Sequence, residues 1–210
     1  MESTDARIGR TLLFLAASLI LAACGKEGPK DLTEYYRWVN DPGHGLIRHH
    51  EVNGVTLTMK YMPPSYLAHQ YVAATPGITQ TQKDSVMQSY RNSLCFLLTI
   101  GVSDSTGDIM TRGIGSYEEF SQRAMRLNFE MQNYVTLRAG EKDYRPALAI
   151  MENTYGMRPK RDVVLVFADD SSLRAADTLD VSFNDTIFET GISHYEFLRK
   201  DMAVVQDLPL

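Results

Sequence analysis

The sequence predicts a mainly β protein: an antiparallel β-sandwich or partly open barrel of seven to eight strands with two short helices. Three observations lead to this class. Several short segments alternate apolar and polar residues, which is typical of a strand with one buried face. An Asn-Gly pair, Asn53-Gly54, separates two such segments as in a tight hairpin. Turns rather than regularly alternating helices connect most segments, which favours antiparallel sheets over βαβ units.

The hairpin is the clearest element. Leu46–Val52 and Val55–Met62 flank the Asn-Gly turn, and the second segment ends at Pro63-Pro64. A two-residue turn would place His50 opposite Leu57 and His49 opposite Thr58. The next strands are expected over 94–102, 129–138, 144–151, 163–168 and 179–183, the last followed by a tight turn at Asn184-Asp185 and a final strand over 186–198 with a bulge at Gly191.

Two helices are expected. The first spans Gln80–Ser93, and the second opens at Ser116, where Glu119 three residues later completes a capping-box pattern. The segment Leu32–Val39 fits either a short helix or an edge strand.

The N-terminus carries the pattern of an export signal. Arg7 and Arg10 precede an apolar run, Leu12–Ala23, that is too short to span a bilayer comfortably. It ends in Leu21-Ala22-Ala23-Cys24, which resembles the lipobox of bacterial lipoproteins at every position. The resemblance implies cleavage before Cys24 and attachment of several acyl chains to it, whereas an ordinary cleaved signal or an uncleaved anchor are the alternatives.

This reading divides the chain into a signal peptide (1–23), a lipidated cysteine with a flexible tether (24–31) and one β-rich domain (32–210). The tether would reach about 20 Å when extended, so the domain would stay close to the membrane. Gly25 follows the cysteine where enteric lipoproteins retained at the inner membrane have aspartate, so the resemblance favours an outer-membrane anchor facing the periplasm.

Composition narrows the function classes. Without residues 1–23 the chain has 187 residues, 19 Lys and Arg and 24 Asp and Glu. A net charge of −5 without a basic cluster argues against a nucleic-acid partner. The two cysteines are Cys24 and Cys95. With Cys24 lipidated, Cys95 has no internal partner, so neither a disulfide framework nor a multi-cysteine zinc site is expected.

Candidate catalytic and metal-binding groups all have simpler interpretations. His49 and His50 are adjacent on a strand and would face opposite sides, so they would not bind one ion together; His44, His69 and His194 complete the set. Ser193-His194 would diverge for the same reason. Cys95 lies in an apolar run, where burial favours the unreactive thiol. Asp104, Asp108, Asp169 and Asp170 lack EF-hand spacing, although a calcium role for either loop stays open. We expect no cofactor and no metal ion.

Aromatic residues concentrate in the first third of the domain. Tyr and Trp suit binding surfaces because they combine an apolar body with a polar group. Tyr66 and Tyr71, in an expected loop after Pro63-Pro64, and Trp38 are the candidate binding residues. The alternative is that the aromatic residues close one edge of the core.

Three functions follow as hypotheses. The first is a non-enzymatic, lipid-anchored accessory or docking module for an envelope protein assembly, an architecture similar at class level to small envelope β-sandwich lipoproteins. The second is a glycan- or peptide-binding lipoprotein using the aromatic surface. The third is a carboxylate-based hydrolase.

Overall fold

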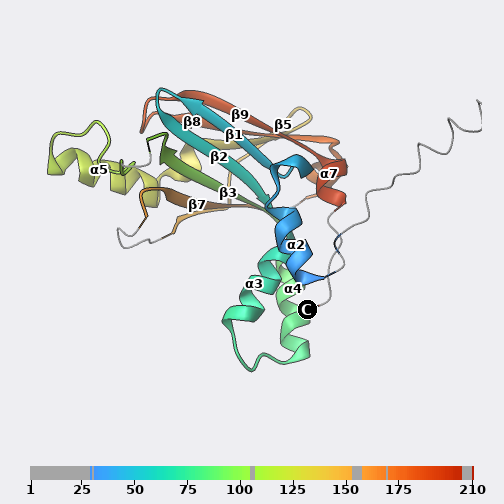
Figure 1. Cartoon of the computed structure of the whole chain (residues 1–210). Helices are drawn as coiled ribbons and strands as arrows, with labels where there is room; N and C mark the ends of the chain where they lie inside the picture. The colour runs from blue at the N-terminus through green and yellow to red at the C-terminus, as the bar shows by residue number, and fades with distance from the viewer. Residues whose placement is uncertain (1–28, 30, 105–106, 153–157, 169, 205–209) are drawn as a thin grey trace, which may run out of the picture.

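The computed structural model describes residues 29, 31–104, 107–152, 158–168, 170–204 and 210. Two antiparallel sheets face each other across one apolar core (Figure 1). The expected signal peptide and Cys24 lie outside the described residues. The predicted class, a mainly β sandwich, is confirmed.

The five-stranded sheet has the order β1-β2-β3-β7-β6, and the four-stranded sheet has the order β5-β4-β8-β9. The strands are β1 (Ile47–Val52), β2 (Val55–Met62), β3 (Ser93–Val102), β4 (Val135–Ala139), β5 (Lys142–Tyr144), β6 (Leu148–Met151), β7 (Arg161–Ala168), β8 (Thr178–Asp185) and β9 (Gly191–Leu198).

The described residues also form six short α-helices, where the sequence had predicted two. These are α2 (Leu32–Val39), α3 (Pro64–Ala74), α4 (Gln80–Arg91), α5 (Tyr117–Phe129), α6 (Ser171–Ala175) and α7 (Arg199–Ala203), with 3-10 turns η1 (Pro42–His44) and η2 (Met131–Asn133). The segment that fitted either a short helix or an edge strand, Leu32–Val39, is helix α2. The Asp31 carboxylate caps it by accepting from the Glu34 amide at 2.8 Å.

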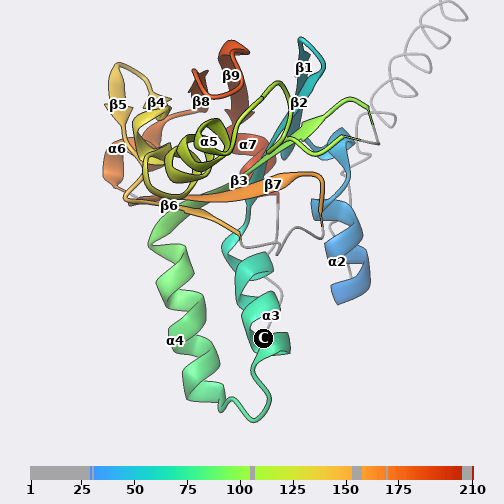
Figure 2. The same ribbon diagram turned by 90° about the vertical axis from the view of Figure 1, so that its left-hand side faces the viewer.

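Aromatic side chains connect the two sheets. Phe96 of β3 is fully buried, and its ring lies 5.2 Å from that of Phe197 on β9 and 6.0 Å from that of Phe167 on β7. On one side of the sandwich the sheets come together, since Arg48 of β1 donates to the Glu196 carbonyl of β9 at 2.7 Å. On the opposite side α5 lies between the sheets and packs on β6 (Figure 2). The two sheets therefore do not join into a closed barrel on the side where α5 lies.

The predicted hairpin and the predicted helix cap at Ser116 are confirmed. Val52 pairs with Val55, His50 with Leu57 and His49 with Thr58. Asn53 and Gly54 have φ of 51° and 72°, as the two-residue turn requires. Thr79 and Gln82 form a full capping box before α4, and the Ser116 hydroxyl caps α5 by accepting from the Glu119 amide.

Two predicted strand segments are wrong in detail. The segment over 129–138 is strand only from Val135, because α5 continues to Phe129 and η2 follows. The segment over 144–151 is divided between the sheets: β5 pairs with β4 and β6 pairs with β7. Pro146 lies between them, where proline cannot donate to a ladder.

The predicted tight turn at Asn184-Asp185 is also wrong, because both residues belong to β8. The connection is longer and is organised by the buried Asp185 carboxylate. It accepts from the amides of Ile187 and Phe188 and from both the amide and the hydroxyl of Thr190. β9 then begins at Gly191, whose φ is 78°. Within the described part of the chain, no helix has the length and apolar character needed to cross a membrane.

Candidate functional site

A helical hairpin projects from the sandwich (Figures 1 and 2). It consists of α3 and α4 and is inserted between β2 and β3, which are adjacent antiparallel strands. The structure places α2, α3 and α4 on the side of the five-stranded sheet that faces away from the four-stranded sheet (Figure 2). Two neighbouring strands need only a short turn, so this insertion is not required to close the sheet.

The hairpin carries few charges. From Pro64 to Arg91 the charged side chains are Lys83, Asp84 and Arg91, whereas most exposed positions are Gln, Thr, Ser or Ala. Charged residues are depleted at the centre of protein interfaces, because their desolvation is costly. The composition of the hairpin therefore fits a surface that meets another molecule.

A groove lies between the helices near the free end of the hairpin. Its volume is about 440 Å³, and it is lined by Tyr71, Thr75, Pro76, Gly77, Ile78, Thr81, Gln82, Ser85 and Val86. Tyr71 is 45 % exposed. The groove thus combines an aromatic ring and aliphatic side chains with neutral hydroxyl and amide groups.

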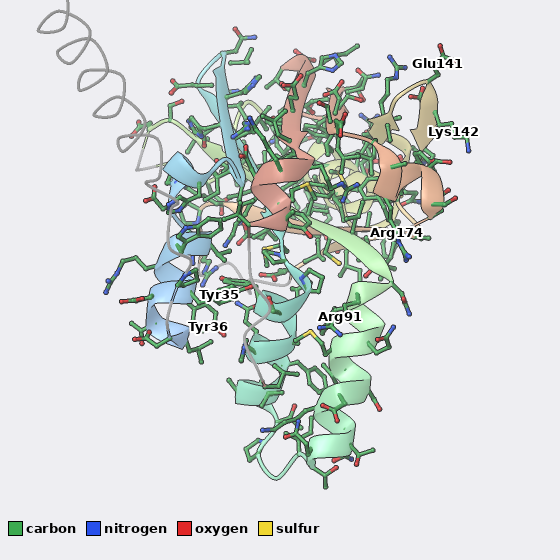
Figure 3. The ribbon with its side chains drawn as sticks, turned by 90° about the vertical axis from the view of Figure 1, so that its right-hand side faces the viewer. Tyr35, Tyr36, Arg91, Glu141, Lys142 and Arg174 are labelled. Carbon is green, nitrogen blue, oxygen red and sulfur yellow. The ribbon has the colours of Figure 1, made fainter. Side chains whose placement is uncertain are left out.

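The base of the helices is held by an aromatic cluster. Tyr35 and Tyr36 of α2 point toward α3 (Figure 3). The Tyr35 hydroxyl and the buried Ser65 hydroxyl are 2.5 Å apart, and the Tyr36 and Tyr66 rings meet edge-on at 5.1 Å. These contacts join α2 to the beginning of α3.

Lys60 of β2 completes this cluster. Its side chain is only 8 % exposed; the ammonium group donates to the Asn40 amide oxygen at 2.6 Å and lies 4.3 Å from the centre of the Tyr66 ring. Burial lowers the pKa of Lys60 to about 8. The ring face and the amide oxygen both favour the charged form, so they oppose the effect of burial.

The outer face of the five-stranded sheet is apolar beside these helices. The strand register places its outward side chains in two rows, Leu148–Val166–Cys95–Met62 and Ile150–Val164–Leu97–Lys60. Exposure decreases along both rows toward β2: Leu148 and Ile150 are half exposed, whereas Cys95, Met62 and Lys60 are buried. This face and the hairpin form one continuous candidate site, called the helical side below.

The three aromatic candidates have different surroundings. Tyr66 is buried and lies in α3, so the expected loop is wrong and the residue belongs to the core. Trp38 of α2 is partly buried, and one face of its ring stacks on His44 at 4.2 Å beside a small pocket of about 150 Å³. Of the three residues, only Tyr71 is exposed. The proposed lipid site, Cys24, lies outside the described residues.

The histidines do not converge. His49 contacts the Thr58 hydroxyl at 3.0 Å on the exposed side of β1, whereas the His50 ring packs 4.9 Å from Tyr195 on the core side. His194 is exposed and bonds Asp180 at 2.8 Å, while the neighbouring Ser193 is buried. No group of three or more potential metal ligands occurs among the residues that the structure describes.

Cys95 and the acidic loops have structural surroundings. Burial raises the pKa of the Cys95 thiol, which disfavours the nucleophilic thiolate. Asp108 bonds Arg161 at 3.1 Å, and Asp170 caps α6 through the Ser172 and Leu173 amides. Asp169 lies outside the described residues. These contacts give Asp108 and Asp170 structural roles.

Sequence reasoning missed the helical side as a unit. Its signal was Pro63-Pro64, interpreted only as the end of a strand, although proline is also favoured at the first helical position and Pro64 occupies it. The apolar rows follow from a register that joins β6, β7 and β3, which are distant in sequence. Comparison with protein-family models, curated proteins and solved structures found no match to this chain.

Proposed function

We propose that this protein is a lipid-anchored, non-enzymatic docking module of the bacterial cell envelope. Cys24 would hold it at the outer membrane facing the periplasm, and a protein partner would bind the helical side. The observation that carries the proposal is the projecting, charge-poor hairpin beside an apolar sheet face. Apolar surface of this kind is rarely left in water unless another molecule covers it.

The anchor and the docking surface support each other physically. Several acyl chains make membrane attachment nearly permanent, since each buried CH₂ contributes about 0.8 kcal/mol. A short tether keeps the domain near the membrane, which raises the local concentration of any partner there. Weak contacts through the hairpin would then suffice for stable assembly.

The test is photo-crosslinking from Tyr71 in living cells. A photoreactive amino acid replaces Tyr71 in the full chain, and the matched control replaces Ser182 on the outer face of the four-stranded sheet. We expect one dominant adduct of fixed mass from position 71 and none from position 182. In Cys24→Ser the chain should leave the membrane fraction and the adduct should decrease several-fold. Equal labelling from both positions would overturn the docking proposal, and membrane retention of Cys24→Ser would overturn the anchor.

A glycan or a peptide is the second candidate ligand, favoured by the groove itself. Tyr71 lies there beside Thr81, Gln82 and Ser85, whose hydroxyl and amide groups can bond sugar hydroxyls or peptide groups. Glycan-array and peptide binding of the full chain should then be lost in Tyr71→Ala and kept in Tyr117→Ala, which removes an exposed tyrosine on α5. Binding that survives Tyr71→Ala would reject this candidate.

A further inference from the structure

The four edge strands of the two sheets differ in charge. β1 carries Arg48 and Glu51, β5 carries Lys142 and Asp143, and β9 carries Glu196. Charged side chains of this kind prevent strands from pairing with other chains. β6 has the sequence Leu-Ala-Ile-Met, with no charge and no proline. It is therefore the one edge strand of the described sheets that carries no charged side chain.

The free backbone groups of β6 are set by its register with β7. The Glu152 amide donates to the Asp162 carbonyl at 2.7 Å, and Leu148 and Ile150 lie opposite Val166 and Val164. Because bonding direction alternates along an antiparallel strand, the amides and carbonyls of Ala149 and Met151 point away from β7. These two residues are available to pair with another strand.

Exposed apolar side chains concentrate at the same end of the molecule. Nine large apolar residues are exposed among the described residues, and five of them lie on α5 and β6, which pack together: Tyr117, Met125, Phe129, Leu148 and Ile150. Phe129 is 73 % exposed. Met125 and Phe129 are one turn apart on α5, on the side away from the buried Leu127. We name α5 together with β6 the open edge.

We propose that the open edge binds a second copy of this chain, with β6 paired antiparallel to β6 about a two-fold axis at Ile150. This interface uses the backbone edge of β6 together with α5. It adjoins the helical side at Leu148 and Ile150 but does not depend on the docking proposal. The joined sheet would contain ten strands.

The register is self-complementary, which favours a second copy over an unrelated strand. With Ile150 opposite Ile150, Ala149 of each copy lies opposite Met151 of the other. The backbone amides and carbonyls of Ala149 and Met151, which point away from β7, then all bond the other copy. This gives four backbone hydrogen bonds across the axis. The small Ala149 side chain leaves room for Met151 on the core side of the joined sheet.

The strand alone is too short for a stable interface. Stable interfaces bury roughly 1,600 Å² in total, far more than a four-residue edge provides. Two-fold pairing puts both α5 helices on the same side of the joined sheet, where Met125 and Phe129 can contribute apolar area. The proposal therefore accounts for both parts of the open edge.

Cysteine crosslinking tests the register. Ile150→Cys in the full chain should form a disulfide-linked dimer under mild oxidation, because directly opposite β-carbons in a non-hydrogen-bonded pair are about 4.5–5.5 Å apart. Leu148→Cys should crosslink at least several-fold less, since its opposite residue is Glu152. The unaltered chain controls for Cys24 and Cys95. Crosslinking of Ile150→Cys no greater than that of Glu51→Cys on β1, or an adduct with a different protein, would overturn the proposal.

Solution mass provides the second test. The full chain in detergent should be a dimer by light scattering, and Ile150→Lys should make it a monomer that still unfolds in one cooperative transition. Ile192→Lys is the matched control, because Ile192 is 62 % exposed on β9. It should stay dimeric. A monomeric parent chain, or a dimer that persists in Ile150→Lys, would contradict the pairing.

Discussion

The outer faces of the two sheets are opposite in character. On the four-stranded sheet most outward side chains are charged or polar, with Ile192 an exposed exception. Arg138 bonds Asp143 at 2.7 Å, and Asp180 bonds His194 at 2.8 Å. On the five-stranded sheet, the face beside the helices consists of apolar rows that end on the buried Lys60. Both sheets bury their inner faces in the same core.

This difference between the outer faces shows which apolar surface serves the fold and which does not. One sheet meets water with a polar face, as antiparallel sheets commonly do. The other keeps aliphatic residues on a face that the sandwich core does not cover. The inner faces of the two sheets bury each other without the hairpin α3–α4, so the helical side is where function is expected.

The largest expected effect comes from the core that both faces share. Phe96→Ala should lower the free energy of unfolding by about 3–5 kcal/mol, because it removes ring contacts with Tyr61, Phe167 and Phe197 and leaves a cavity. Denaturant unfolding measures the loss, and Phe96→Leu should cost clearly less. A loss below about 1 kcal/mol would show that the two sheets do not depend on a common core.

Placing the same charge on each outer face compares the two directly. Val164→Lys should cost about 1–2 kcal/mol, because the charge would lie between Leu97 and Ile150. Ser182→Lys should stay within about 0.5 kcal/mol on the polar face. The midpoints of urea unfolding give both values. Equal costs would mean that the apolar face is not distinct in its energetics.

Lys60 gives the helical side a pH dependence. Its pKa is lowered to about 8 by burial, against an ordinary value of 10.5. At pH values between these two pKa values, the unfolded chain binds more protons than the folded chain. The contribution of Lys60 to the free energy of unfolding therefore increases as pH rises. The stability of Lys60→Met minus that of the parent chain should therefore fall, on the order of 1 kcal/mol, from about pH 7 to about pH 10. A difference that does not change with pH would contradict this account.

The smallest effect is expected on the polar face. Arg138→Ala breaks the two bonds to Asp143, but both side chains are exposed, where ion pairs contribute little. The thermal midpoint should not change measurably. A large drop would show that the polar face supports the fold more than its exposure suggests.

How far the sequence predicts this molecule depends on how local each signal is. The hairpin at Asn53-Gly54 and the cap at Ser116 each depend on residues close together in sequence, and both were predicted correctly. The capping box at Thr79 is equally local but was not predicted. Asp185 was misread as part of a tight turn, because its carboxylate bonds as far as Thr190.

The helical side depends on contacts between distant segments. Alternation along one strand shows that it has a buried face, but only the order β3-β7-β6 shows that the other faces combine into apolar rows. Likewise, Tyr66 and Tyr71 looked equivalent in sequence, and the packing of α3 on Tyr36 and Lys60 buries the first while leaving the second exposed. The lipobox at Cys24 stays a prediction.

Hydroxyl-radical footprinting of intact envelopes tests the central claim most directly, because it reports the exposure of individual side chains. Rates at Tyr71 and Val166 on the helical side are compared with those at His194 and Ile192 on the four-stranded sheet, in envelopes and in the purified full chain. The account predicts that Tyr71 and Val166 become several-fold less reactive in envelopes, whereas His194 and Ile192 do not change. Unchanged rates at Tyr71 and Val166, or equal protection of all four residues, would contradict it.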